Sequence, residues 1–196
     1  MPLTQFLNDR GFKSFEGYCQ LENKQVDDLI FLTNKPNIDI MEIGFNAGHS
    51  AEVFLKNNST LKLTSFDLGR HDYVLTGKEY IDAMYKNRHT LILGNSIITI
   101  PKYINDNPNK KFDVIFIDGG HDYSIANADL ENCMNLAHKD TIVIIDDTIY
   151  TPGWKHGYTI GPTKTWLEHI ANNKIIEINK KDYGPGHGMS WGKYNI

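Results

Sequence analysis

Cysteine is scarce in this sequence, with only Cys19 and Cys133 among 196 residues, far apart along the chain. Both stand in apolar, helix-like stretches, so we expect buried, reduced thiols rather than a disulfide. Long apolar runs are missing as well. The N-terminus has no basic segment followed by an apolar stretch, and no apolar stretch is long enough to span a bilayer. We therefore expect a cytoplasmic protein with no membrane partner.

Positive charge is also in short supply. Lys and Arg total 20 against 24 Asp and Glu, which gives a net charge of −4. Without a large positive field the chain is a poor partner for a phosphate backbone, so we expect a small-molecule partner and no nucleic acid. Hydrophobic residues make up 40% of the sequence, which excludes disorder or a coiled coil for the whole chain. The length fits a single domain.

Short β-branched runs alternate with helix-period segments, which is typical of a βαβ series that forms a parallel sheet. Two runs, 114–117 and 142–145, are apolar without alternation, as expected for central strands covered on both faces. The predicted strands are residues 38–43, 62–67, 90–93, 112–118 and 141–146. Apolar residues three and four apart predict helices that include residues 51–55, 80–85, 97–104 and 125–137.

The two ends of the chain complete this arrangement. Apolar spacing from Val26 to Thr33 predicts a helix that stops before Pro36, and residues 1–20 carry no clear pattern. We therefore treat residues 1–35 as an N-terminal helical cover and residues 36–196 as the main domain. After the last parallel strand we expect a loop, a helix near 162–171, and an antiparallel pair formed by 174–179 and 189–194.

Polar residues follow the first three predicted strands, and open α/β sheets bind ligands at the carboxyl ends of their strands. The first strand leads into a glycine turn with the spacing Glu-x-Gly-x-x-x-Gly at residues 42–48. This is not the Gly-x-Gly-x-x-Gly that holds a pyrophosphate, so it favours a ligand with a carboxylate. Asp67 ends the second strand, where a carboxylate can bind both ribose hydroxyls, and residues 94–96 suit a purine edge. Each feature taken alone has another explanation. A glycine turn after a strand can serve packing only, and Asp67 can be the cap of the following helix.

Taken in order, these residues resemble the class I S-adenosylmethionine-dependent methyltransferases over about residues 38–150. Glu42, Gly44 and Gly48 match the first motif, Asp67 matches the ribose-binding acidic residue, and residues 112–118 match the fourth-strand motif. The resemblance implies an α/β fold that is Rossmann-like and doubly wound, with a mostly parallel seven-stranded sheet and a C-terminal antiparallel strand pair. It implies S-adenosylmethionine as cofactor, bound by Glu42, Gly44, Phe45, Asn46, Gly48, Ser50, Asp67, Asn95, Ser96 and Asp118.

Acidic residues gather at the ends of the fourth and fifth predicted strands. Asp118, Asp146 and Asp147 should meet in one crevice, because neighbouring parallel strands end at the same edge of the sheet. Three carboxylates that close cannot all stay ionised without a counter-charge. A divalent cation is the simplest one, with Mg²⁺ ahead of Mn²⁺ and Ca²⁺ for oxygen ligands. In the alternative, Asp146 or Asp147 caps the following loop and Asp118 contacts only the cofactor.

The same residues resemble the metal-dependent O-methyltransferases, and residues 117–123 are particularly similar to members that act on sugar hydroxyls. That resemblance implies Asp118, Asp146 and Asp147 as metal ligands and His121 as general base. Coordination lowers the pKa of a hydroxyl, and an imidazole with a pKa near 6.5 can then take its proton. A structural His121 is the alternative. His49, His71 and His89 are expected at solvent or cap positions.

The resulting hypothesis is an S-adenosylmethionine-dependent O-methyltransferase with a small acceptor, a sugar or nucleotide-sugar hydroxyl ahead of a phenolic or catechol one. Tyr73, Trp154 and Tyr158 are the predicted substrate residues, although a loop aromatic is often core packing. His187 and Trp191 could reach the same rim. Relatives of this type are often dimers or larger, so a homo-oligomer is expected.

Three other classes compete with this hypothesis. An NAD-dependent oxidoreductase shares the fold but needs the missing pyrophosphate motif. A metal-dependent phosphohydrolase could use the acidic cluster, yet it would leave the glycine turn and Asp67 without a role. A non-catalytic S-adenosylmethionine-binding protein would keep the first three strand ends and lose the acceptor site.

Overall fold

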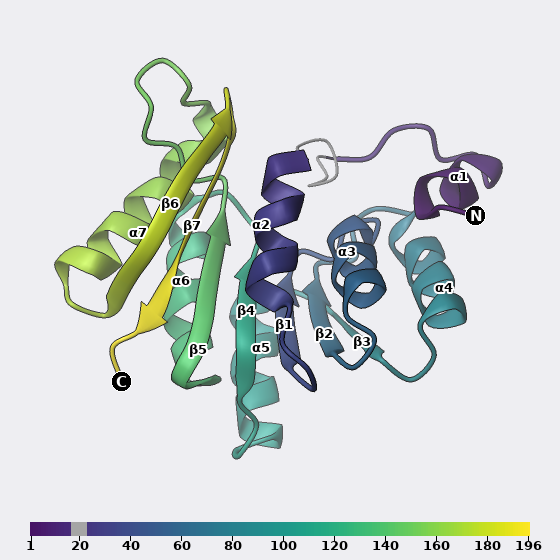
Figure 1. The fold of residues 1–196 in the computed structure, drawn as a ribbon, viewed down its shortest axis with the longest axis horizontal. Coiled ribbons are helices and arrows are strands. Elements are labelled where there is room, and N and C mark those ends of the chain that lie inside the picture. The colour runs from purple at the N-terminus through teal and green to yellow at the C-terminus, as the bar shows by residue number, and fades with distance from the viewer. Residues whose placement is uncertain (17–22) are drawn as a thin grey trace.

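A seven-stranded sheet with helices on both faces forms the centre of the computed structural model, which describes residues 1–16 and 23–196 (Figure 1). The strands are β1 (Asp39–Ile43), β2 (Lys62–Asp67), β3 (His89–Leu93), β4 (Phe112–Ile117), β5 (Ala137–Asp146), β6 (Ile175–Gly184) and β7 (His187–Tyr194). The helices are α1 (Leu3–Asp9), α2 (Asn23–Thr33), α3 (His49–Asn57), α4 (Val74–Met84), α5 (Ser96–Asp106), α6 (Tyr123–Met134) and α7 (Ile160–Ala171), with a short 3₁₀ helix at Gly157–Thr159. Among the described residues, none of the helices is long and apolar enough to cross a membrane.

The strands lie in the order β3-β2-β1-β4-β5-β7-β6. All pairs from β3 to β5 are parallel, whereas β7 is antiparallel to both β5 and β6. The predicted fold class is therefore confirmed, with a doubly wound parallel part and a C-terminal antiparallel pair. The chain reverses direction across the sheet between β1 and β4, which is where such sheets bind ligands.

Two separate hydrophobic cores explain why β4 and the end of β5 read as continuous apolar runs. Along β4, Val114 and Phe116 face a core shared with α1 to α4, while Ile115 and Ile117 face a core shared with α5 to α7. Successive side chains of a strand point to opposite faces. In a strand that is buried on both faces, every position is therefore buried and favours an apolar residue. Cys133 is buried in the second core, and burial raises the pKa of its thiol well above the usual range. The other cysteine, Cys19, lies outside the described residues.

The N-terminal helices cover one face of the sheet. Leu3 and Leu7 lie one turn apart on α1. Both are fully buried in the core to which α3 and α4 also contribute. Helix α2 lies in front of β1 and β4 in Figure 1, and its Leu29 is fully buried in the same core. Helix α2 therefore lies beside the middle of the sheet, whereas α1 lies farther out, beside α4 (Figure 1).

Two predicted boundaries are wrong. Ala137 continues the apolar spacing of α6, but the helix ends at Met134 and Ala137 pairs with Phe112 at the start of β5. The chain turns there because the Leu136 N–H donates to Cys133 and the Leu136 carbonyl accepts from Phe112. The C-terminal hairpin is longer than predicted. Its strands continue through polar residues to Gly184 and from His187, because backbone pairing needs no apolar side chains.

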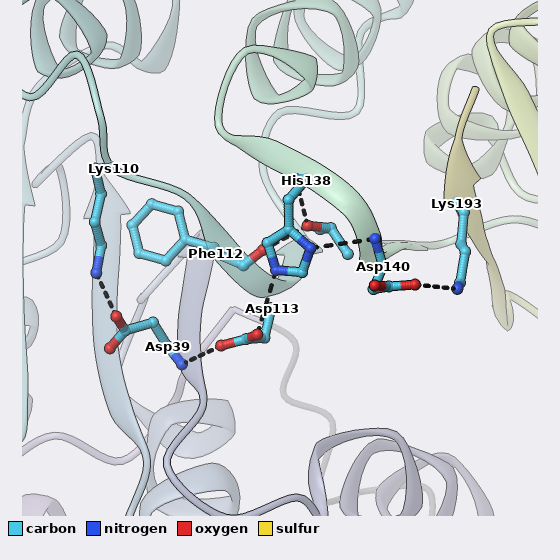
Figure 2. A network of polar contacts seen from close by, with 8 residues as sticks. Asp39, Lys110, Phe112, Asp113, His138, Asp140 and Lys193 are labelled. Carbon is cyan, nitrogen blue, oxygen red and sulfur yellow. Dashed lines mark hydrogen bonds and ion pairs between the residues drawn. The ribbon is translucent and has the colours of Figure 1, made fainter. Parts of the chain in front are cut away.

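A network of polar contacts ties the amino ends of the strands together, at the edge opposite the predicted ligand edge (Figure 2). Lys110 pairs with Asp39 at the start of β1, and the Asp39 N–H donates to Asp113 Oδ2 at 2.8 Å. Asp113 Oδ1 lies 3.3 Å from His138 Nε2, which extends the network to β5. These partly exposed pairs fix the relative position of strand starts and leave the other edge open for a site.

Candidate active site at the carboxyl ends of the strands

One cavity of about 570 Å³ lies at the carboxyl ends of the parallel strands. Its size is within the usual range for a small-molecule site. Most of the predicted site residues line it, from both the cofactor end and the acidic end: Gly44, Phe45, Asn46, Ser50, Asp67, Asn95, Ser96, Asp118, His121, Asp146 and Asp147. The structure thus brings together residues that the sequence separates by about a hundred positions.

The turn after β1 is built for close backbone approach. Gly44 has a φ of +97°, and a Cβ at this position would lie 1.8 Å from the carbonyl oxygen of Asp118. The ends of β1 and β4 can touch only because residue 44 has no side chain. Gly48, also at positive φ, closes the turn through a hydrogen bond to the Phe45 carbonyl. Gly48 itself does not line the cavity; it shapes the turn that does.

Asp67 links this turn to the end of β2. Its Oδ2 accepts the backbone N–H of Asn46 at 2.7 Å, and its Oδ1 accepts the N–H of Gly69 at 2.7 Å. The carboxylate is therefore held at the wall of the cavity by two backbone donors. At the end of the neighbouring strand β3, Asn95 Oδ1 accepts the N–H of Ile97 and caps α5, which presents Ser96 to the same space.

Glu42 lies beneath the cavity and not in its lining. Its side chain is fully buried and accepts hydrogen bonds from Ser50 Oγ and, at 2.6 Å, from Ser65 Oγ. Strand alternation explains this placement, because Met41 and Ile43 face the α5–α7 core and Glu42 must face the other way. Burial raises the pKa of Glu42 to about 7. Its observed role is to hold the start of α3 against β2.

Glutamine in place of Glu42 should flatten part of the pH dependence of stability. The folded-state pKa lies above the ordinary 4.5, so the stabilising neutral form is lost as pH rises through about 7. Because a tenfold difference in proton affinity is worth about 1.4 kcal/mol, the free energy of unfolding should fall by about 2.5 kcal/mol more in the parent than in Glu42→Gln between pH 5 and pH 8. Urea denaturation at both values measures this. Glu79→Gln, at an exposed glutamate, is the control, and equal pH slopes in the parent and Glu42→Gln would contradict the prediction.

The acidic end of the cavity holds a histidine and three aspartates. His121 Nε2 lies 2.7 Å from Asp147 Oδ2, and this hydrogen bond raises the pKa of His121. Asp147 adopts a φ of 58°, a left-handed conformation that aspartate tolerates better than most residues. Burial and then the neighbouring Asp146 and Asp147 raise the pKa of Asp118 well above its usual range. Ionisation of all three carboxyl groups is therefore unfavourable, and His121 is the neighbour whose charge favours the ionised form of Asp118.

Ligand atoms of Asp118, His121 and Asp147 all lie within 4.8 Å of one another, which is close enough to bind one ion. The predicted set of Asp118, Asp146 and Asp147 overlaps with this group in two members. Asp146 lies next to it, and its Oδ1 accepts a hydrogen bond from Gln25 of α2. The donor set of carboxylates and one imidazole suits a divalent cation.

The predicted substrate residues lie outside the cavity lining. Tyr73 is buried, and its hydroxyl accepts the N–H of Glu16 at 3.3 Å. The Tyr158 hydroxyl donates to the Gly186 carbonyl at 3.1 Å, and its ring centroid lies 5.5 Å from that of His121. The Trp154 carbonyl accepts from the N–H of Gly186. Contacts with the turn of the hairpin therefore hold both Trp154 and Tyr158, and the ring of Tyr158 lies next to the lining residue His121.

Several lining residues were not predicted: Glu16, Gln25, His49, Leu68, Arg70 and His71 among them. His187, which was expected to reach the rim, does line the cavity. Glu16 Oε2 pairs with His71 Nε2 at 2.7 Å, and the Glu16 carbonyl accepts from the Asn46 side chain. The expectation of a solvent or cap position is wrong for His49, which is buried and lines the cavity. Burial lowers the pKa of His49 to about 4, so its ring is neutral at neutral pH.

A family described as a methyltransferase domain matches residues 41–148, more than half of the chain. The chain belongs to this methyltransferase family. The matched stretch includes the glycine turn, Asp67 and all three acidic residues of the cluster. No curated protein matches the methyltransferase.

Solved structures share the fold of this methyltransferase at low sequence identity. An O-methyltransferase from Bacillus cereus in complex with SAH is 15% identical, with a TM-score of 0.72 over 97% of this chain and 90% of that one. TomG, an O-methyltransferase from Streptomyces achromogenes in complex with SAM, is 13% identical, with a TM-score of 0.73 over 99% and 88%. CalS11, a TDP-rhamnose 3′-O-methyltransferase of calicheamicin biosynthesis, is 18% identical, with a TM-score of 0.67 over 99% and 92%.

Proposed function

We propose that this methyltransferase transfers the methyl group of S-adenosylmethionine to a hydroxyl of a small acceptor, a sugar or nucleotide-sugar, with a divalent cation and His121 as base. One observation carries the proposal. A single cavity joins the glycine turn and Asp67 at one end to Asp118, His121 and Asp147 at the other. A cofactor at the first end would thus lie beside acid–base chemistry at the second.

The cofactor end suits an adenosyl group joined to an amino acid. Asp67, fixed by two backbone N–H donors, can bind ribose hydroxyls, and Asn95 with Ser96 offers small polar groups to a purine. The left-handed turn at Gly44 lets the backbone approach a carboxylate and amine closely. The SAH and SAM complexes of the Bacillus cereus enzyme and TomG support a cofactor of this class in a fold of this shape.

The acidic end can prepare a hydroxyl for attack. A divalent cation held by Asp118, Asp146 and Asp147 would lower the pKa of a bound hydroxyl. His121 would accept the hydroxyl proton, and Asp147 would orient the ring and stabilise the imidazolium. Because Nε2 is paired with Asp147, a neutral His121 offers Nδ1 as its basic nitrogen. The acceptor oxygen forms the new bond to the methyl carbon while the carbon–sulfur bond breaks, which releases the thioether.

Methyl transfer from labelled S-adenosylmethionine to two hydroxyl panels, nucleotide-sugars and catechols, tests this proposal directly. We expect transfer with at least one nucleotide-sugar and slower or no transfer to catechols. The sugar assignment rests on similarity to sugar-modifying enzymes, of which CalS11 is an example with the same fold. The reverse preference would replace the sugar acceptor with a phenolic one. Tight binding of S-adenosylhomocysteine without transfer to either panel would instead support a non-catalytic binding protein.

Removal of divalent cations should lower the rate of methyl transfer at least about tenfold, because the acceptor hydroxyl would lose its activating charge. Protein treated with a chelator and passed through a desalting column provides the measurement, with Mg²⁺ or Mn²⁺ added back to restore activity. Binding of S-adenosylhomocysteine by calorimetry is the control, and it should be retained because Asp67 and the glycine turn lie at the other end. An unchanged rate after thorough cation removal would exclude the metal.

A further inference from the structure

Helix α2 brings a buried amide to the acidic end of the cavity. Gln25 is only 2% exposed, lines the cavity, and donates a hydrogen bond from Nε2 to Asp146 Oδ1 at 2.7 Å. The two residues are 121 positions apart in the sequence. A glutamine this deeply buried usually has a hydrogen-bonded partner that defines its role, and here the described partner is one of the acidic residues of the site.

A second set of contacts fixes α2 in this position. Asp28, one turn beyond Gln25, accepts hydrogen bonds from Lys181 Nζ and Tyr183 Oη, both at 2.7 Å. Leu29, on the same side of the helix, is fully buried in the core. Residues three and four apart lie on one face of a helix, so Gln25, Asp28 and Leu29 dock together. Because the β6–β7 hairpin holds the helix, Gln25 is presented to Asp146 from a rigid support.

The described hydrogen bonds to the Asp146 carboxylate both go to the same oxygen. Asp146 Oδ1 accepts from Gln25 and also from the backbone N–H of Asp147 at 2.9 Å. Two donors on one oxygen fix the plane of the carboxylate, and the described contacts leave Oδ2 to the cavity. An amide orients the carboxylate without adding positive charge, whereas a lysine or arginine would compete with a cation. This is the arrangement expected for a ligand held in place by an outer-shell partner.

We propose that Gln25 is a positioning residue that orients Asp146 toward a divalent cation and thereby sets the cation affinity of the site. The proposal rests on the metal-dependent function proposed above and adds a residue from outside the region matched by the methyltransferase family. It assigns α2 a part in the reaction that neither the strand ends nor the glycine turn provides.

The test is a Mn²⁺ titration of the full chain saturated with S-adenosylhomocysteine, followed by electron paramagnetic resonance of the free ion. Gln25→Met keeps the side-chain length and helix propensity and removes only the amide. We expect its dissociation constant for Mn²⁺ to rise about ten- to a hundredfold, as is typical when an outer-shell partner is lost, with cofactor affinity unchanged. Gln5→Met is the matched control, since Gln5 makes the same kind of bond to Asp9, at 2.6 Å, on the exposed side of α1.

Mn²⁺ affinity in Gln25→Met equal to that of the parent would overturn the positioning role while leaving the proposed function intact. Absence of Mn²⁺ binding by the parent would overturn both. If Gln25→Met does not fold, the side-chain amide resonances of the parent give the answer. The Gln25 amide should shift on addition of Mg²⁺ and the Gln5 amide should not, and a Gln25 signal that does not respond would refute the proposal.

Discussion

Replacing His121 with alanine is expected to lower the rate of methyl transfer by about 10²- to 10⁴-fold, the range for loss of a general base. The acceptor proton would lose the imidazole that pairs with Asp147, and Asp147 would lose the partner that lies 2.7 Å away. Binding of S-adenosylhomocysteine should persist, because Asp67 and Asn95 at the cofactor end make their hydrogen bonds to residues other than His121. Single-turnover kinetics with labelled cofactor and calorimetry measure the two effects separately.

The chain supplies a matched control for this variant in His138. It pairs with Asp113 at 3.3 Å and is about as exposed as His121, 37% against 39%, but it lies at the amino ends of the strands (Figure 2). His138→Ala should therefore leave the rate unchanged. A His121→Ala protein that turns over within a few-fold of the parent would show that another group accepts the proton. Equal losses in both variants would point to general destabilisation.

Gly44→Ala is expected to destabilise the fold by about 3 kcal/mol or more and to abolish cofactor binding. A side chain in the left-handed region costs about 1–2 kcal/mol by itself. Here its Cβ would also lie 1.8 Å from the Asp118 carbonyl oxygen. That backbone cannot move aside freely, because the Asp118 N–H donates to the Ile43 carbonyl at 2.9 Å. The substitution would separate the glycine turn from the acidic cluster.

Gly11→Ala separates the two costs. Gly11 has a φ of +95°, close to that of Gly44, but a Cβ there would meet nothing within 4 Å. It should show only the cost of the backbone conformation, about 1–2 kcal/mol in urea denaturation. If Gly44→Ala loses no more stability than Gly11→Ala and still binds S-adenosylhomocysteine, the contact between the ends of β1 and β4 does not shape the site.

The sequence alone was enough to place the parallel strands and the residues at their ends. Apolar runs such as 114–117 require burial on both faces, and parallel strands side by side must end at the same edge. Asp67, Asp118 and Asp147 therefore reach one cavity by rules that act over a few residues and one sheet. Glu42 marks a limit of these rules. The family resemblance predicts that it binds the cofactor, but strand alternation places its side chain on the α3 side of the sheet, beneath the cavity lining.

Tertiary structure alone decided which distant side chains complete the site. No periodicity connects Gln25 with Asp146, and Glu16 meets His71 only because the N-terminal segment is folded over the glycine turn. Likewise, the Trp154 backbone and the Tyr158 hydroxyl are held by hydrogen bonds to Gly186 in the turn of the β6–β7 hairpin, whose length depends on pairing rather than on apolar pattern. Local sequence encodes strand faces and turns, whereas contacts between segments depend on how whole elements pack.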